Sequence, residues 1–408
     1  MNAPPGVPWQ VTGNHWITLP CIHPVDASLH MVSAIHAASR GSIEFAGAPE
    51  YLEGDGPPLL RVTLSVDGEV RPVGADGLAW ERELGWIPTF SSRVGDIAIR
   101  GVICAPHGRD ADVSGAVIEI ALENRGETSA TVSLGVTGSL AHRALRVRTP
   151  RLFDDGHRVS RGAGGSVVLE PATAQSPVAM AIGAEGDARS ELSAADPTQW
   201  SIGEELRIEA GASISRAFFL AVGQERDGAE AVLSVMRRRG SSALIAATRA
   251  ALRLMEPATG NPAIDRLIAR HLFFAYFCSV ARALDDAHVY VMRSRLPWNG
   301  RGATVRDWEA LMWVLPAVQL ADQSLARELL LRICEVHGYA PGAGVHYLDG
   351  ALFEPGFSLE GAAAFPVAVD SYIVKSGDDK IVEEPMLADA LYGAAEDIET
   401  HRHETLPL

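Results

Sequence analysis

The sequence is 408 residues long, 47% hydrophobic and 21% charged, with a formal net charge of −16. This length allows two or three domains, and so acidic a surface argues against nucleic acid and anionic membranes as partners. The chain shows no signal-peptide pattern and no apolar run of the ~20 residues that a membrane helix needs. Its four cysteines form no CxxC pair, so we expect reduced thiols, no metal site and a cytoplasmic protein. We also expect no cofactor.

The first 225 residues predict antiparallel strands. Residues 59–66 alternate between apolar and polar side chains, and Asp67-Gly68 then predicts a two-residue hairpin turn. Residues 117–122 and 132–136 predict a second such pair across a polar turn at 124–128. Many short strands at this spacing are typical of a large β-sandwich.

From residue 226 the apolar period becomes helical. Asn261 and Pro262 predict the N-cap and first residue of a largely buried helix. An amphipathic helix with Gly338 as its C-cap is expected next, and then a buried helix that ends at Gly377. Alternating buried and amphipathic helices suit the inner and outer layers of a helical barrel. The expected domains are therefore a β-sandwich at 1–225, a helical linker at 226–258 and a partial (α/α)-barrel of helical hairpins at 259–408.

Asp307, in the stretch "NGRGATVRDWEALMWVLPAV" of residues 299–318, has two interpretations. In the structural one, Asp307 pairs with Thr304 as a capping box and favours the helix dipole. Trp308 and Leu315 are then core, and Pro316 kinks the helix.

The functional interpretation starts from the glycine-rich segment before Asp307, which carries Trp298, Arg301 and Arg306. Tryptophan faces stack on sugar rings, and arginine forks bind hydroxyls and carboxylates. An acidic residue at the N-terminal end of a rigid helix can point into a cleft. The two interpretations are compatible, since a helix-initiating carboxylate can also face a ligand.

Two later positions add polar candidates. The segment 344–360 predicts a hairpin at Asp349-Gly350 that carries His346 and Glu354 among aromatic residues, although a solvated hairpin explains it equally. Asp370 interrupts an apolar helix, so it must be paired, face a cavity or lie on the wet side of that helix.

The C-terminal half resembles the six-hairpin, (α/α)6-barrel glycosidases. The resemblance rests on "NPAIDRLIARHLFFAYFCSVARAL", "VRDWEALMWVLPAVQLAD", "ARELLLRICEVHG" and "HYLDGALFEPGFSLEGAAAFPVAVDSYIVKSGD". Within this superfamily the sequence is most similar to bacterial proteins related to the amylo-α-1,6-glucosidase part of glycogen debranching enzymes. Such relatives often carry a β-sandwich and a helical linker before the barrel.

The resemblance implies inverting hydrolysis of an α-glucan or oligosaccharide by a general acid and a general base. It places the acid at Asp307, provided that Arg306 turns towards substrate or another carboxylate. The candidate substrate-binding residues are Arg306, Trp308, Trp298, Arg301, His346, Glu354 and Asp370. A full barrel needs twelve helices, whereas residues 256–408 provide about half at ordinary helix lengths. The expected barrel is therefore incomplete and lacks the base, as in a fragment, in a protein completed by a second chain or homodimer, or in a non-hydrolytic protein.

Two alternatives follow from other classes of function. A glycoside phosphorylase would use phosphate as nucleophile and require a basic anion site, to which Arg301 and Arg306 could contribute. A non-catalytic carbohydrate-binding protein would bind sugar without forming product. The sequence shows no Rossmann, P-loop, zinc or GxSxG motif.

Overall fold

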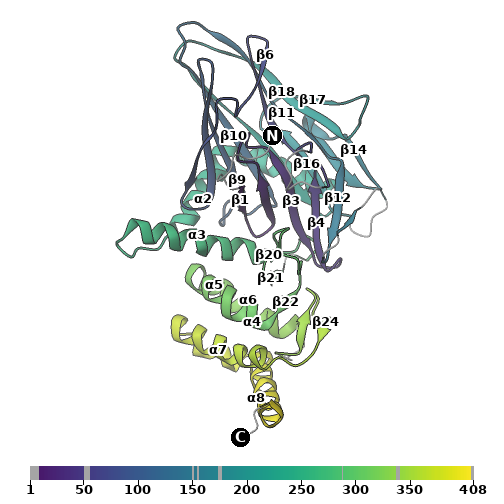
Figure 1. The fold of residues 1–408 in the computed structure, drawn as a ribbon, viewed down its shortest axis with the longest axis vertical. Coiled ribbons are helices and arrows are strands. Elements are labelled where there is room, and N and C mark those ends of the chain that lie inside the picture. Colours follow the sequence, from purple (N-terminus) through teal and green to yellow (C-terminus); the bar gives the residue numbers. More distant parts are fainter. Residues whose placement is uncertain are drawn as a thin grey trace. The chain divides into compact units, whose positions relative to one another are not determined.

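The computed structural model describes residues 9–49, 56–148, 151–153, 156–172, 177–286, 288–336 and 341–405. The chain divides into two compact units. The first comprises Met1–Ala34, Ile43–Leu145 and Leu152–Glu256, and the second comprises Ile35–Ser42, Arg146–Arg151 and Pro257–Leu408. Strands, drawn in purple to teal in Figure 1, dominate the first unit, while helices in green and yellow dominate the second.

Most strands of the described chain belong to three antiparallel sheets. Their orders are β1-β2-β3-β4-β12-β13, β14-β15-β16-β19-β10-β9-β8-β7 and β17-β18-β11-β5-β6. The bounds are β1 Gln10–Gly13, β2 Ile17–Ile22, β3 Leu29–His36, β4 Gly41–Ala46, β5 Arg61–Val66, β6 Glu69–Pro72, β7 Ala79–Glu83, β8 Ile87–Val94, β9 Ile97–Cys104, β10 Gly115–Asn124, β11 Ala130–Ser139, β12 His142–Arg146, β13 Leu152–Phe153, β14 His157–Arg161, β15 Val167–Pro171, β16 Ala179–Ala184, β17 Arg189–Leu192, β18 Gln199–Ile208 and β19 Ser213–Gly223. A short 3-10 turn, η1, spans Ala163–Gly165.

The hairpin predicted at Asp67-Gly68 joins β5 to β6, with Val66 opposite Glu69. Asp67 has φ of 50° and Gly68 has φ of 85°. Positive φ at both central residues is the requirement of a type I′ turn, whose twist matches that of the strands. Local chemistry therefore determines this register.

The second predicted hairpin is wrong. β10 pairs with β9 and β19, whereas β11 pairs with β5 and β18, so residues 125–129 carry the chain from one sheet to another. The Asn124 side chain donates to the carbonyls of Thr128 and Ile208 and accepts from the amide of Gly126. These bonds satisfy backbone groups at the corner where the chain leaves β10 for β11.

Two helices follow the strands within the first unit. α1 (Arg226–Arg239) packs against β16 and β19 and buries Ala229, Leu233 and Met236. α2 (Ser241–Leu254) begins after Gly240, whose φ is 81°. The segment expected to be a linker thus forms helices that group with the strands.

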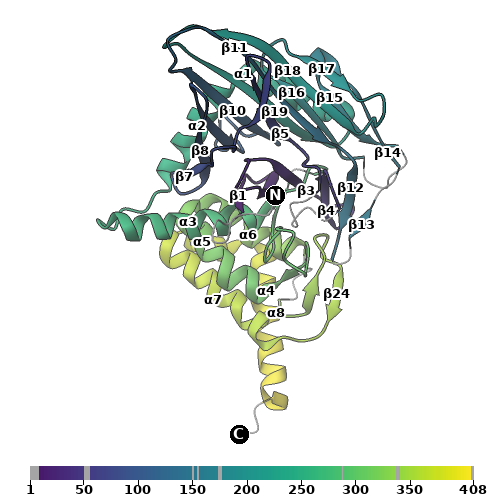
Figure 2. The ribbon, with the colours of Figure 1, turned by 45° about the horizontal axis from the view of Figure 1, so that its top comes forward.

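The second unit stacks helices with short strands between them (Figures 1 and 2). α5 packs against α3, α6 and α7, and α8 packs against α6 and α7. The bounds are α3 Pro262–Cys278, β20 Val280–Arg282, β21 Val289–Val291, β22 Val305–Arg306, α4 Asp307–Glu309, the π-helical η2 Ala310–Val314, α5 Leu315–Ala321, α6 Gln323–Val336, β23 Gly344–His346, β24 Leu352–Pro355, α7 Leu359–Ser376, η3 Asp379–Glu383 and α8 Pro385–Thr405. None of the described helices is long and apolar enough to span a membrane.

The predicted start of α3 and the predicted end of α7 agree with the structure. Asn261 caps α3 by accepting a hydrogen bond from the amide of Ala263 at 3.0 Å, and Pro262 is the first helical residue. Gly377 ends α7 in the left-handed conformation, with φ of 72°. The predicted C-cap Gly338 lies outside the described residues.

Replacing Asn261 with alanine is expected to cost about 1 kcal/mol of stability, because the Ala263 amide loses its capping acceptor. Urea unfolding followed by far-ultraviolet circular dichroism measures the change. Asn261→Ser is the matched control, since its hydroxyl can still accept this bond. Equal destabilisation by both substitutions would show that the hydrogen bond to the Ala263 amide is not the cause.

Several large apolar side chains of the second unit are exposed, and we call them the open stripe. On α3 they recur at helical spacing, and others lie on η2, α5 and α7. The members are Ile264, Leu267, Phe274, Trp313, Leu320, Val367 and Val374, which are 37–77% exposed. Because α5 packs against both α3 and α7, these side chains lie on neighbouring helices and are candidates for a contact surface.

Candidate functional site

The candidate site begins where β22 runs into a helix. Val305 pairs with His346 and Arg306 with Val345, and α4 starts immediately at Asp307. Pro316 has no N–H to donate to the residue four positions earlier, and the turn before it, η2, has π geometry. Such π turns occur frequently at functional sites. The first turn of this helical segment, α4, consists of Asp307, Trp308 and Glu309.

The capping box predicted between Thr304 and Asp307 is wrong. The Thr304 hydroxyl donates to the carbonyl of Arg301 at 2.9 Å, and Arg306 occupies the cap position without a side-chain capping bond. The reason is geometric, since residues 305 and 306 are extended in β22 and displace Thr304 from the helix end.

Asp307 is buried, with 1% of its surface exposed. Its Oδ2 accepts a hydrogen bond from the amide of Gly342 at 2.7 Å. Gly342 has φ of 82°, and a Cβ there would lie 2.6 Å from the carbonyl oxygen of Ser358, so a side chain would push this amide out of position. A long-range backbone donor thus holds the Asp307 carboxylate.

The thiol of Cys334 on α6 interacts electrostatically with the carboxylate of Asp307. Burial raises the pKa of its thiol to about 12, and the negative charge of Asp307 acts in the same direction. The thiol is therefore protonated at neutral pH and unreactive.

Glu309, two residues after Asp307, is a second buried carboxylate that lies close to two arginines. It is 7% exposed, and the Arg293 guanidinium donates to its Oε1 at 3.1 Å. Arg301 lies 3.7 Å from the same oxygen. Arg293 also stands 5.6 Å from the ring centre of Trp313, within cation–π range.

Glu309, Arg293 and Trp313 were not among the residues predicted from the sequence. Glu309 had a visible signal, because a second carboxylate follows Asp307 in one helical turn. Arg293 and Trp313 had none, since their approach to Glu309 and to each other depends on the fold of the preceding loop.

That loop is held against the carboxyl end of α3. The buried Arg295 donates to the carbonyl of Phe277 at 2.8 Å, a favourable place for a cation at a helix C-terminus. Burial lowers the pKa of Arg295 to about 10, so it stays charged. The Ser279 hydroxyl donates to the carbonyl of Arg293 at 2.8 Å. These bonds fix the backbone from which Trp298 and Arg301 project.

The predicted tryptophans are both accessible. Trp298 is 51% exposed and Trp308 is 38% exposed. Trp308 was expected to be core in the structural interpretation, and its exposure follows from its place in the first turn, between two buried carboxylates. Hydrogen bonds from its own backbone amide and from Ser358 lower the pKa of Glu360 at the start of α7, and the positive charge of Arg306 acts in the same direction.

The predicted loop at 344–360 is the hairpin of β23 and β24. His346 is 2% exposed, and its Nδ1 lies 3.1 Å from the carbonyl oxygen of Gly350. Glu354 is on the surface and pairs with Arg148 at 3.6 Å, an exposed ion pair that adds little stability. His346 therefore helps shape the hairpin, whereas Glu354 faces solvent.

Asp370 lies in the middle of α7 and is exposed. Val367 and Val374 of the open stripe flank it at three and four residues. Asp370 thus stands on the wet side of its helix in this structure. Among the described residues, no group of three or more His, Cys, Asp or Glu side chains is arranged to hold a metal ion.

A large antiparallel strand-rich part followed by helices also occurs in solved structures of other proteins. A structure provisionally assigned as a kojibiose phosphorylase from the human microbiome is similar over 93% of this chain and 56% of its own, with a TM-score of 0.55 and 11% identity. A bacterial glucoamylase complexed with acarbose covers 95% of this chain and 60% of its own, with a TM-score of 0.49 and 10% identity. The chain thus spans little more than half the length of either.

No family model and no curated protein matches the chain. The likeness to the phosphorylase shows a shared fold. It is consistent with the order of strands and helices that the resemblance implied, and it does not point to debranching-enzyme relatives.

Proposed function

We propose that this chain acts on a neutral α-glucan or oligosaccharide, as part of an inverting glycosidase with Asp307 as its general acid. The observation that carries the proposal is the first turn of α4, which holds two buried carboxylates beside exposed tryptophans and two arginines. Tryptophan faces and arginine forks are the groups that bind sugar rings and hydroxyls. The net charge of −16 favours an uncharged substrate over an anionic one.

We assign no general base within this chain. The open stripe is where the further helices that carry the base would pack. Apolar side chains on α3, α5 and α7 are suited to packing against further helices. We propose that a second chain, a second copy or a continuation of the polypeptide supplies them and completes the barrel. The α-1,6 specificity of debranching enzymes is the narrower form of this proposal.

Phosphorolysis is the second candidate. Arg293 and Arg301 both approach one carboxylate, Glu309, and guanidinium groups are well suited to binding phosphate. One similar structure, with a TM-score of 0.55, is itself provisionally assigned as a kojibiose phosphorylase.

Product analysis tests both candidates. We expect the full-length protein to cleave maltooligosaccharides, isomaltooligosaccharides or kojibiose, with reducing sugar as product if it hydrolyses them. A sugar 1-phosphate formed only in the presence of phosphate would establish the phosphorylase instead. Sugar binding in calorimetry with no product under either condition would reject both reactions and leave a binding protein.

A further inference from the structure

The sheet β17-β18-β11-β5-β6 carries a polar row across four strands of the first unit. Thr137 on β11 is directly opposite Arg61 on β5 and Ser201 on β18, and Ser201 is opposite Glu191 on β17. Directly opposed residues of antiparallel strands project from the same face, with Cβ atoms ~4.5 to 5.5 Å apart. The row therefore places a cation, two hydroxyls and a carboxylate side by side.

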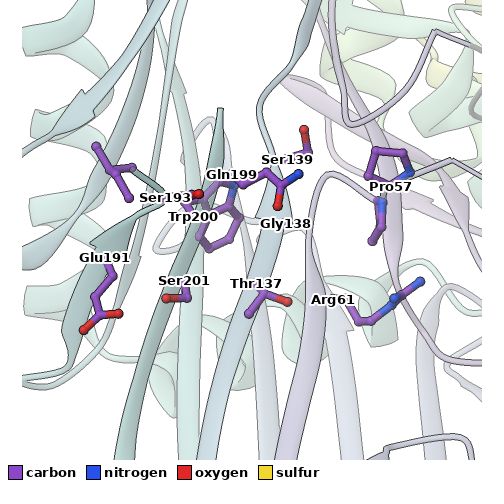
Figure 3. A pocket seen from close by; sticks show the side chains of 12 residues that line it. Pro57, Arg61, Thr137, Gly138, Ser139, Glu191, Ser193, Gln199, Trp200 and Ser201 are labelled. Carbon is purple, nitrogen blue, oxygen red and sulfur yellow. The ribbon is translucent and has the colours of Figure 1, made fainter. Parts of the chain in front are cut away.

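A pocket of about 410 Å³ lies over this row. Its size falls within the range of ligand sites, ~300 to 1,000 Å³. Figure 3 shows Arg61 and Glu191 at opposite ends, with Thr137 and Ser201 between them. Pro57, Pro58 and Leu192 also line the pocket and provide apolar contacts.

The guanidinium of Arg61 is held in place by an ion pair with Asp26. Its Nε pairs with Oδ2 of the buried Asp26 at 3.0 Å. Burial by itself raises the pKa of Asp26, but hydrogen bonds from His23 and Ser28 and the charge of Arg61 outweigh it, so the pKa lies well below its usual range. Asp26 is therefore a fixed anion, and it orients the guanidinium before any ligand arrives.

The charges of the row select the class of ligand. The positive charge of Arg61 is already matched by Asp26, which leaves Glu191 to repel an anion. A cation could pair with Glu191 alone, because the rest of the row offers hydroxyls and a guanidinium. Sugar hydroxyls both donate and accept hydrogen bonds, so they can accept from Arg61, donate to Glu191 and exchange bonds with Thr137 and Ser201. The apolar C–H faces of sugar rings can pack on the prolines.

We infer that this pocket is a carbohydrate-binding site for neutral oligosaccharides, separate from the candidate catalytic segment. The proposed function supports only the choice of sugar, because every group that forms the pocket belongs to the strand-rich unit. A chain that holds glucan here could bind its substrate at a second point and gain avidity.

Calorimetric titration of the full-length protein with maltoheptaose tests the inference, with cellohexaose as a second neutral probe and trigalacturonate as an anionic one. We expect a neutral oligosaccharide to bind and the double substitution Thr137→Val with Ser201→Ala to weaken binding at least tenfold. Ser133→Ala is the matched control, since Ser133 is an exposed residue of β11 that does not line the pocket. It should leave the affinity unchanged.

The outcomes separate this inference from the proposed function. Binding that survives Asp307→Asn but is lost in the double variant supports a site on the sheet. Binding that survives the double variant but is lost in Asp307→Asn overturns the pocket while it supports a sugar site at α4. No binding of either neutral probe, or tighter binding of trigalacturonate, also overturns it. Thermal melting of each variant checks that the fold is retained.

Discussion

Asp307→Asn is expected to lower the rate of glycosidic bond cleavage by ~10²- to 10⁴-fold, the usual contribution of a general acid. An amide cannot donate the proton that the leaving oxygen requires. Its oxygen can still accept the hydrogen bond from the Gly342 amide, so the packing around residue 307 should be retained. Steady-state kinetics on the substrate found by product analysis measures the rate, and circular dichroism measures the fold.

Asp389→Asn is the matched control, because Asp389 is an exposed carboxylate on α8. It should leave the rate unchanged. Full activity in Asp307→Asn would remove the acid assignment. Glu309→Gln then becomes the decisive variant, since Glu309 is the other buried carboxylate of the same turn.

Stability is expected to decrease by roughly 3 kcal/mol as the pH falls from 6.5 to about 4, because of His30. Burial, reinforced by the neighbouring His23 and Arg61, lowers the pKa of His30 from 6.5 to about 4. The folded protein therefore binds fewer protons than the unfolded chain between these values. The contribution of neutral His30 is complete above pH 6.5 and is lost as the pH falls through this window.

Urea unfolding at several pH values between 4 and 7 measures this slope. His30→Gln should flatten it, since an amide does not titrate but can still bond the Ser28 hydroxyl, which lies 3.0 Å from Nε2 of His30. His271→Gln is the control, because His271 is exposed on α3. An unchanged slope in His30→Gln would assign the acid sensitivity to other groups. The lowered pKa of Asp26 adds a further loss only below its ordinary value of 3.8.

Features with local causes were predictable from the sequence. Asp67-Gly68 determines its own turn, Asn261 caps its own helix, and Gly377 ends α7 because it adopts positive φ easily. The change from strand to helix periodicity near residue 226 also gave the order of the two parts of the fold.

Features that depend on distant partners were not predictable. The alternation in β10 and β11 is the same whether two strands pair with each other or enter separate sheets, so the sequence could not place them. Glu309 meets Arg293 only because the loop after α3 folds back on Phe277. The pocket over Thr137 arises from four strands whose pairing is not encoded in any one of them.

The open stripe also has a consequence for handling the protein. Charge repulsion from a net −16 keeps copies apart at low ionic strength, when the Debye length is long. Added salt shortens that range to ~8 Å near physiological strength and leaves the attraction between apolar side chains such as Leu320 and Val374 in place. We therefore expect the purified chain to precipitate least in dilute buffer and to precipitate more readily on addition of salt while this surface is uncovered.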